Sequence, residues 1–156
     1  NVYVSQLSRM ECRSGPRTPE AEAALRRINA RLFAVCADHI QACLTAFRFS
    51  WGSEAELPAG VEQALCDGQL EVRREHQLGE AGRVDFFVRF VDGPRRSVAV
   101  ELKTKGSPAD IIRQLHRYAA HEDVLGVILV STSLRLRAPA ELAGKPTHTI
   151  HLARLA

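Results

Sequence analysis

Asp85, Glu101 and Lys103 are the residues whose types and spacing best suit catalysis. Each lies in a short run that predicts a β-strand, over residues 83–91 and 97–104. Successive side chains of a strand point to opposite faces, so the three odd-numbered residues share a face if the strands are neighbours. Two carboxylates suit Mg²⁺, which prefers hard oxygen ligands, and an ammonium group beside them can orient or help deprotonate a water molecule.

The turn between these two strands leaves two pairings open. In the first, Val91 pairs with Ser97, and Asp85 then lies opposite Lys103 and diagonal to Glu101. In the second, shifted by two residues, Asp85 lies directly opposite Glu101. Either pairing brings the charged groups to within roughly 5–8 Å at Cβ. The even-numbered face of both strands is apolar, so we expect that face to be buried and the odd-numbered face to be presented.

The composition of the chain is that of an ordinary globular protein. The chain has 156 residues, about one domain's length, with 46% hydrophobic and 25% charged residues, as in ordinary globular proteins. The net charge of +3 is compatible with a polyanionic partner. No apolar run reaches the length of about 18 residues that a transmembrane helix needs, and no secretory signal pattern is present. We therefore expect no membrane partner and a cytoplasmic protein, of a bacterial cell or a phage-infected host.

Helical patterns precede the strands. Residues 1–17 show no apolar period and are predicted to be a mobile N-terminal arm. Thr18 followed by Pro19 is a typical helix start, and the apolar stripe that continues to Phe47 predicts one long helix or two helices end to end. Residues 54–66 predict another helix, which ends near a glycine.

The remaining pattern predicts an α/β fold. A strand at 70–77 completes a three-strand meander, and a helix at 108–120 leads to an apolar strand at 124–130. A strand that follows a crossover helix lies parallel to its predecessor, so the sheet should be mixed and flanked by helices. After residue 137 we expect a short helix and a last strand near 147–153. Residues 18–156 would then form one domain.

Two motifs and two helical residues resemble the PD-(D/E)xK nuclease superfamily, which has the restriction-endonuclease-like fold. The motifs are GRVDF at 82–86 and VAVELK at 98–103. Gln114 and Tyr118 on the following helix are similar to the Gln-x-x-x-Tyr element of the RecB-like branch, which includes phage lambda exonuclease. The resemblance covers about residues 54–132. Val84 stands where the proline that names the family would be.

The resemblance implies a metal-dependent deoxyribonuclease. By analogy, Asp85, Glu101 and the main-chain carbonyl of Leu102 would bind Mg²⁺ or Mn²⁺. Lys103 would activate or position the attacking water, and Gln114 would help to position the site. The alternative is a catalytically inactive nucleic-acid-binding or assembly module with the same fold.

Further acidic residues are candidates for the metal site. Glu75 shares a face with Asp85 if the turn between their strands centres on Glu80, so it is a candidate accessory ligand, with an edge charge as the alternative. The family often adds an acid from the first core helix. Three residues qualify by position, and the sequence does not choose among Glu54, Glu56 and Glu62.

DNA is the partner that the resemblance implies. Tyr118, Arg113, Arg117 and Lys105 are the candidate nucleic-acid contacts, although Tyr118 also fits a core position and the basic residues also fit a solvated face. No recognised groove-reading element is present, which favours backbone contacts and cutting that depends on DNA ends or structure. Exonuclease, endonuclease and junction resolvase all stay open.

Two further expectations concern cofactors and assembly. Family members with an iron–sulfur cluster use three cysteines after the catalytic core, whereas the four here all precede Asp85, so we expect no cluster. The amphipathic N-terminal helix is a candidate interface for a homo-oligomer, or a cover for the sheet.

Overall fold

The computed structural model describes residues 17–50, 52–53 and 55–153. Of the predicted N-terminal arm, residues 1–16 lie outside this description. The described elements are, in chain order, α2 (Pro19–Ala46), α3 (Glu56–Asp67), β1 (Leu70–Gln77), the 3₁₀ turn η1 (Gly79–Ala81), β2 (Arg83–Phe90), β3 (Ser97–Lys103), α4 (Pro108–Ala119), β4 (Val124–Ser131), β5 (Glu141–Leu142) and β6 (Lys145–His151).

The strands form the mixed sheet that the sequence predicts, in the order β1-β2-β3-β4-β6-β5. The first three strands make an antiparallel meander, and β4 lies parallel to β3 after the crossover helix α4. β6 adds a second parallel neighbour to β4. The α/β class and the crossover are therefore confirmed.

The C-terminal part of the chain differs from expectation. The predicted short helix after residue 137 is wrong, because this segment forms β5 and β6 as a hairpin. Ala143 and Gly144 join these strands with φ of 49° and 74°. Two consecutive residues with positive φ are typical of a tight type I′ hairpin turn, which explains how so short a strand as β5 can pair.

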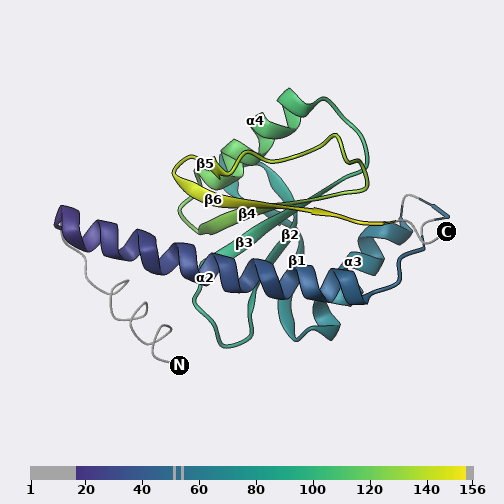
Figure 1. The fold of residues 1–156 in the computed structure, drawn as a ribbon, viewed down its shortest axis with the longest axis horizontal. Coiled ribbons are helices and arrows are strands. Elements are labelled where there is room, and N and C mark those ends of the chain that lie inside the picture. Colours follow the sequence, from purple (N-terminus) through teal and green to yellow (C-terminus); the bar gives the residue numbers. More distant parts are fainter. Residues whose placement is uncertain (1–16, 51, 54, 154–156) are drawn as a thin grey trace.

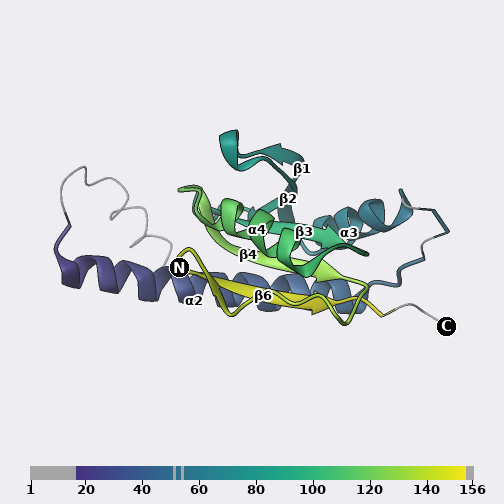
Figure 2. The same ribbon diagram turned by 90° about the horizontal axis from the view of Figure 1, so that it is seen from above.

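Helices cover both faces of the sheet. One core cluster joins α2 and α3 to Phe86, Val100 and other residues of one face, and a second joins α4 to Phe87 and Ala99 of the opposite face. Figure 2 shows α2 running along one side of the sheet. The expectation that the odd-numbered face is presented to solvent is wrong, because α4 packs on it. The apolar side of α4 carries Ile111, Leu115, Tyr118 and Ala119.

Helix α2 is a single helix of 28 residues. The Thr18 hydroxyl accepts a hydrogen bond from the Ala21 N–H at 3.1 Å, as expected of an N-cap. Its buried residues begin at Phe33, and the N-terminal half extends past the edge of the sheet (Figures 1 and 2). Within the described residues, no helix has the length and apolar character needed to cross a membrane.

Candidate active site

The β2–β3 pairing brings the two predicted ligands together. Phe86 pairs with Val100 and Val88 with Val98, which is the second of the two pairings that the sequence left open. Asp85 and Glu101 are the next pair, and there the backbone ladder has ended. Both acids therefore lie where the two strands begin to separate.

The side chains of these acids replace the missing ladder bonds. The Asp85 N–H donates to Glu101 Oε2 at 3.3 Å, and the Leu102 N–H donates to Asp85 Oδ2 at 2.8 Å. Each carboxylate thus binds a backbone N–H of the opposite strand. Buried backbone donors are costly when unpaired, so these bonds allow the strands to part without leaving two donors unsatisfied.

Strand β1 is also irregular beside Asp85. The β1–β2 ladder runs from Leu70 with Phe90 to Gln77 with Arg83, centred on Glu80 as predicted, but it omits the pair of Glu75 with Asp85. Glu75 has a φ of 48°, which side chains other than glycine rarely adopt.

The even-numbered side chains of β2 belong to different core clusters before and after Asp85. Val84 belongs to the α4 cluster, whereas Phe86 belongs to the α2–α3 cluster. The prediction that Val84 and Phe86 share a face is therefore wrong, because the strand is irregular at Asp85, where the β1–β2 ladder omits a pair without changing its register. Asp85 lies between these two residues, at the point where the ladder omits its pair with Glu75.

Lys103 completes the group. Its Nζ lies 3.1 Å from Glu101 Oε1, and its side chain is 27% exposed while that of Glu101 is 3% exposed. The main chain at Lys103 is held as well, because its carbonyl accepts a hydrogen bond from the Ser131 hydroxyl at 2.8 Å. The ammonium group is thus fixed at the boundary between the buried carboxylate and solvent.

Burial and proximity perturb both acids. Burial, followed by the negative charge of Asp85, raises the pKa of Glu101 to about 7, against the opposing effect of Lys103. Burial also raises the pKa of Asp85, with Glu75 acting in the same direction. The hydrogen bond from the Leu102 N–H and the charges of Lys103 and Arg74 oppose that rise. Perturbed carboxyl groups at one place are a feature of functional sites.

Gln114 and Tyr118 join α4 to β2, the strand that carries Asp85. Gln114 Nε2 donates to Tyr118 Oη at 2.8 Å, and Tyr118 Oη donates to the Arg83 carbonyl at 2.7 Å. Tyr118 is 1% exposed, so the prediction that it contacts nucleic acid is wrong. Burial, and then the charge of Glu101, raises the pKa of Tyr118 to about 12, so the hydroxyl keeps its proton and ties α4 to β2.

The other predicted contacts lie at the surface. Lys105, Arg113 and Arg117 are exposed, and the Arg113 guanidinium pairs with the Asp110 carboxylate one helical turn away. Each can therefore reach a polyanion, and their role as nucleic-acid contacts stays a prediction.

The candidate accessory acids make different contacts. Glu54 lies outside the described residues. Glu56 accepts a hydrogen bond from the Gly52 N–H at 2.5 Å, and Glu62 pairs with Arg74 at 2.8 Å. Within the described ranges, no three His, Cys, Asp or Glu side chains form a group that could hold a metal ion. Glu75 acts on Asp85 through its charge, and its role as a ligand stays a prediction.

Sequence reasoning missed two residues that support the site. Arg74 lies over the Phe86 ring, 5.1 Å from its centroid, and its charge acts on Asp85. Ser131 is fully buried and anchors Lys103. Its only signal in the sequence is that a hydroxyl ends an otherwise apolar strand.

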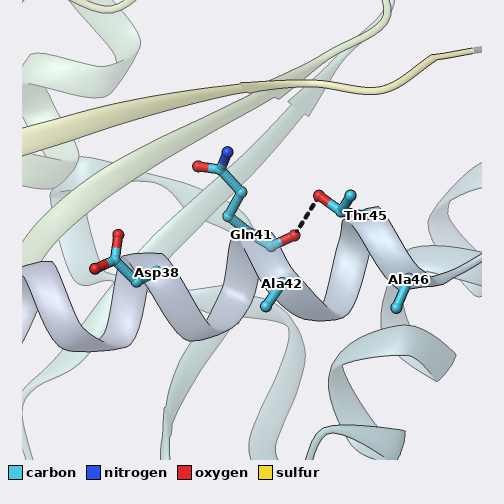
Figure 3. Close-up of a pocket in the computed structure, with 5 residues that line it drawn as sticks. All are labelled: Asp38, Gln41, Ala42, Thr45 and Ala46. Carbon is cyan, nitrogen blue, oxygen red and sulfur yellow. Dashed lines mark hydrogen bonds between the residues drawn. The ribbon is translucent and has the colours of Figure 1, made fainter.

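A shallow pocket lies elsewhere, along α2. Figure 3 shows that its lining comes from one helix, on the layer opposite α4. Gln41 in this lining also contacts His148 of β6, with Oε1 2.5 Å from Nε2. The lining residues are Asp38, Gln41, Ala42, Thr45 and Ala46. The pocket contains none of the predicted catalytic residues.

Comparisons with protein-family models, with curated proteins and with solved structures found no match to this chain.

Proposed function

We propose that this chain is a metal-dependent nuclease that hydrolyses DNA phosphodiester bonds on a restriction-endonuclease-like core. The observation that carries the proposal is the contact between two acids that lie together below the surface. Glu101 is 2% exposed and accepts a hydrogen bond from the Asp85 backbone N–H, and the Lys103 ammonium group lies within ion-pair distance of it. Placing a buried carboxylate beside a half-buried one is costly, so a role other than stability is the simpler explanation.

The donor atoms fit a hard divalent cation. Among the hydrogen bonds of the described residues, Asp85 uses only Oδ2, which leaves Oδ1 available as a ligand. Glu101 contributes a second carboxylate, and burial raises the pKa of both acids although Lys103 opposes that rise. Mg²⁺ usually takes one or two carboxylates and keeps water and phosphate oxygens as its other ligands. Asp85, Glu101 and the Leu102 carbonyl would hold it.

The protein residues would divide the chemistry among them. A bound Mg²⁺ or Mn²⁺ supplies polarisation of the scissile phosphate and a lowered pKa for a coordinated water. Lys103 directs one of its three N–H donors to Glu101 Oε1, and the others remain to orient the attacking water or to bind a phosphate oxygen. Tyr118 and Gln114 are positioning residues, because their hydrogen bonds fix α4 against the strand that carries Asp85.

The substrate follows from charge and from surface composition. Lys105, Arg113 and Arg117 are exposed cations on the loop and helix that follow β3. Such groups bind the phosphate backbone without reading its sequence. We therefore propose DNA as the substrate, with cutting that depends on DNA structure.

Cleavage of supercoiled, linear and branched DNA tests the proposal, in Mg²⁺, Mn²⁺ or EDTA. We expect metal-dependent cleavage by the wild type and a loss of at least about 100-fold in Glu101→Gln, since the acid is needed for the metal. Glu80→Gln, an exposed residue of η1, is the matched control and should cleave normally. If the wild type binds DNA but cleaves none of the substrates in either metal, the chain is instead the inactive binding module.

A further inference from the structure

The N-terminal half of α2 carries an apolar stripe that the core does not use. Leu25, Ile28 and Leu32 recur with the spacing of a heptad repeat, and Ala21 and Val35 continue it in both directions. Among the described residues, Leu25 and Ile28 belong to neither core cluster, and Val35 is 60% exposed. A regular apolar stripe of this kind is typical of a helix that packs against another helix.

The stripe lies on a different side of α2 from the residues that contact the sheet. The residues that α2 buries are Phe33, Cys36, Ala37, Ile40 and Leu44. With 3.6 residues per turn, the stripe is rotated from them by roughly 110° around the helix axis. The N-terminal half of α2 also extends past the edge of the sheet, so this stripe is presented beyond the α/β core (Figures 1 and 2).

A buried polar atom lies beside the stripe. The side-chain Oδ1 of Asn29 is shielded from solvent, yet it accepts no hydrogen bond among the described residues. A buried acceptor without a donor is costly. Asn29 directly follows Ile28 of the stripe, so a second helix packed on the stripe would bring side-chain donors to this oxygen.

The charges beside the stripe are divided between two parts of the helix. Glu20 and Glu22 lie in the first turn, and Arg26, Arg27 and Arg31 follow. A parallel pair of identical helices would place the arginines of one copy beside those of the other. An antiparallel pair instead places the acidic turn of each copy beside the arginines of its partner, which is favourable. The occupant with complementary charge is therefore a second copy of this helix, running in the opposite direction.

The stripe also complements itself in an antiparallel pair centred on the middle of the projecting half. Leu25 then faces the partner's Ile28, and Ala21 faces the partner's Leu32, so a small side chain lies opposite a large one. Two-fold symmetry repeats both contacts. The paired segment is residues 20–33, about 21 Å of helix. The two sheets therefore lie at opposite ends of the pair and do not collide.

We propose that the chain forms a homodimer through the N-terminal half of α2, paired antiparallel with the same segment of a second copy about a two-fold axis. In this arrangement Glu20 lies beside the partner's Arg31, and Asn29 lies beside the partner's Glu22 and Arg26. An arginine side chain has only donors, so it can satisfy the Asn29 oxygen. The dimer does not depend on the proposed nuclease function and can be tested without metal or DNA.

Sedimentation velocity over a wide range of protein concentrations measures the association. Wild type should sediment as two chains at high concentration. Ile28→Asp should lower the association constant at least about 100-fold, because it buries a charge in both central layers of the pair. Ala30→Asp is the matched control, since Ala30 is exposed on the opposite side of the same helical turn and should leave the dimer intact. Circular dichroism checks that both variants are folded.

A charge swap tests the direction of the pairing. Arg31→Glu should weaken the dimer about fivefold, since two symmetry-related contacts with the partner's Glu20 become repulsive. Adding Glu20→Arg to the same chain should restore the association, because each contact is again between opposite charges. In a parallel pair Arg31 would face its own copy, and Arg31→Glu would not weaken the association. That result would overturn the antiparallel arrangement.

Two results would overturn the dimer interface itself. Wild type that sediments as one chain at every concentration would exclude it. If Ile28→Asp also lowered the Tm of that single chain, the stripe would be covered by another part of the same chain. A dimer that persists in Ile28→Asp would show that the two copies associate through a different surface.

Discussion

Replacing Glu101 by glutamine should stabilise the metal-free protein at alkaline pH. Glu101 is 2% exposed and its pKa is raised from 4.5 to about 7, so the folded state holds a proton that the unfolded state releases. Below pH 4.5 both states are protonated, and the residue contributes no pH dependence. As the pH rises from 4.5 to about 7 the folded protein loses stability, and above 7 the whole cost is present.

The size of this cost follows from the difference in pKa. One pKa unit is equivalent to about 1.36 kcal/mol, so the rise from 4.5 to about 7 corresponds to about 3 kcal/mol. Glutamine is neutral and of similar shape, and its side-chain oxygen can still accept a hydrogen bond from the Asp85 N–H. For a chain of 156 residues, about 3 kcal/mol is equivalent to a rise in Tm of about 6–12 °C.

Thermal unfolding followed by circular dichroism, in EDTA and from pH 4 to pH 8.5, measures the effect. The Tm difference between Glu101→Gln and wild type should be small at pH 4 and should grow to its full size above pH 7. Glu80→Gln should follow wild type throughout, because it alters an exposed side chain. If Glu101→Gln instead lowers the Tm by a similar amount at every pH, the ionised carboxylate stabilises the fold and the reasoning is refuted.

Three further changes test the site and the fold. Adding Mn²⁺ should raise the Tm of wild type more at pH 8 than at pH 5.5, where Glu101 keeps its proton; an equal rise at both values would contradict binding at this acid. Tyr118→Phe leaves the Arg83 carbonyl without its donor and should lower the free energy of unfolding in urea by about 1–3 kcal/mol; an unchanged value would mean that the bond is dispensable. Gly126→Ala places a methyl group against the Phe33 ring and should cost about 1–3 kcal/mol by the same measurement, whereas no loss would show that α2 can shift.

Periodicity and turn residues were sufficient to predict most of the sheet. The strand at 70–77 and the crossover helix begin and end within one residue of their predicted limits, because apolar alternation and the proline at the start of α4 are local signals. The last strand was expected near 147–153 and lies at 145–151, but its hairpin partner β5 was missed, because the turn uses Ala143 with a positive φ that alanine rarely adopts.

The proximity of the three candidate residues was predictable from the sequence, whereas the burial of the acids was not. Alternation alone placed Asp85, Glu101 and Lys103 together, and this is confirmed. The depth of Glu101 was not foreseen, because burial depends on α4 packing across the strand, which is a tertiary contact. The positive φ of Glu75 also has no local signal in the sequence, since glutamate has no preference for that conformation.

The separation of β2 and β3 explains how a stable sheet can contain such a site. A continuous ladder would bind the backbone N–H groups of Asp85 and Leu102 to carbonyls and would leave the acids no room to converge. Here the carboxylates accept those N–H groups themselves, so the same side chains that would hold a metal also close the end of the sheet. Removing either side chain entirely should therefore leave a buried donor unpaired as well as abolish the proposed chemistry. For this reason Asp85→Asn and Glu101→Gln, which keep an acceptor oxygen, separate catalysis from folding, whereas the alanine variants would confuse the two.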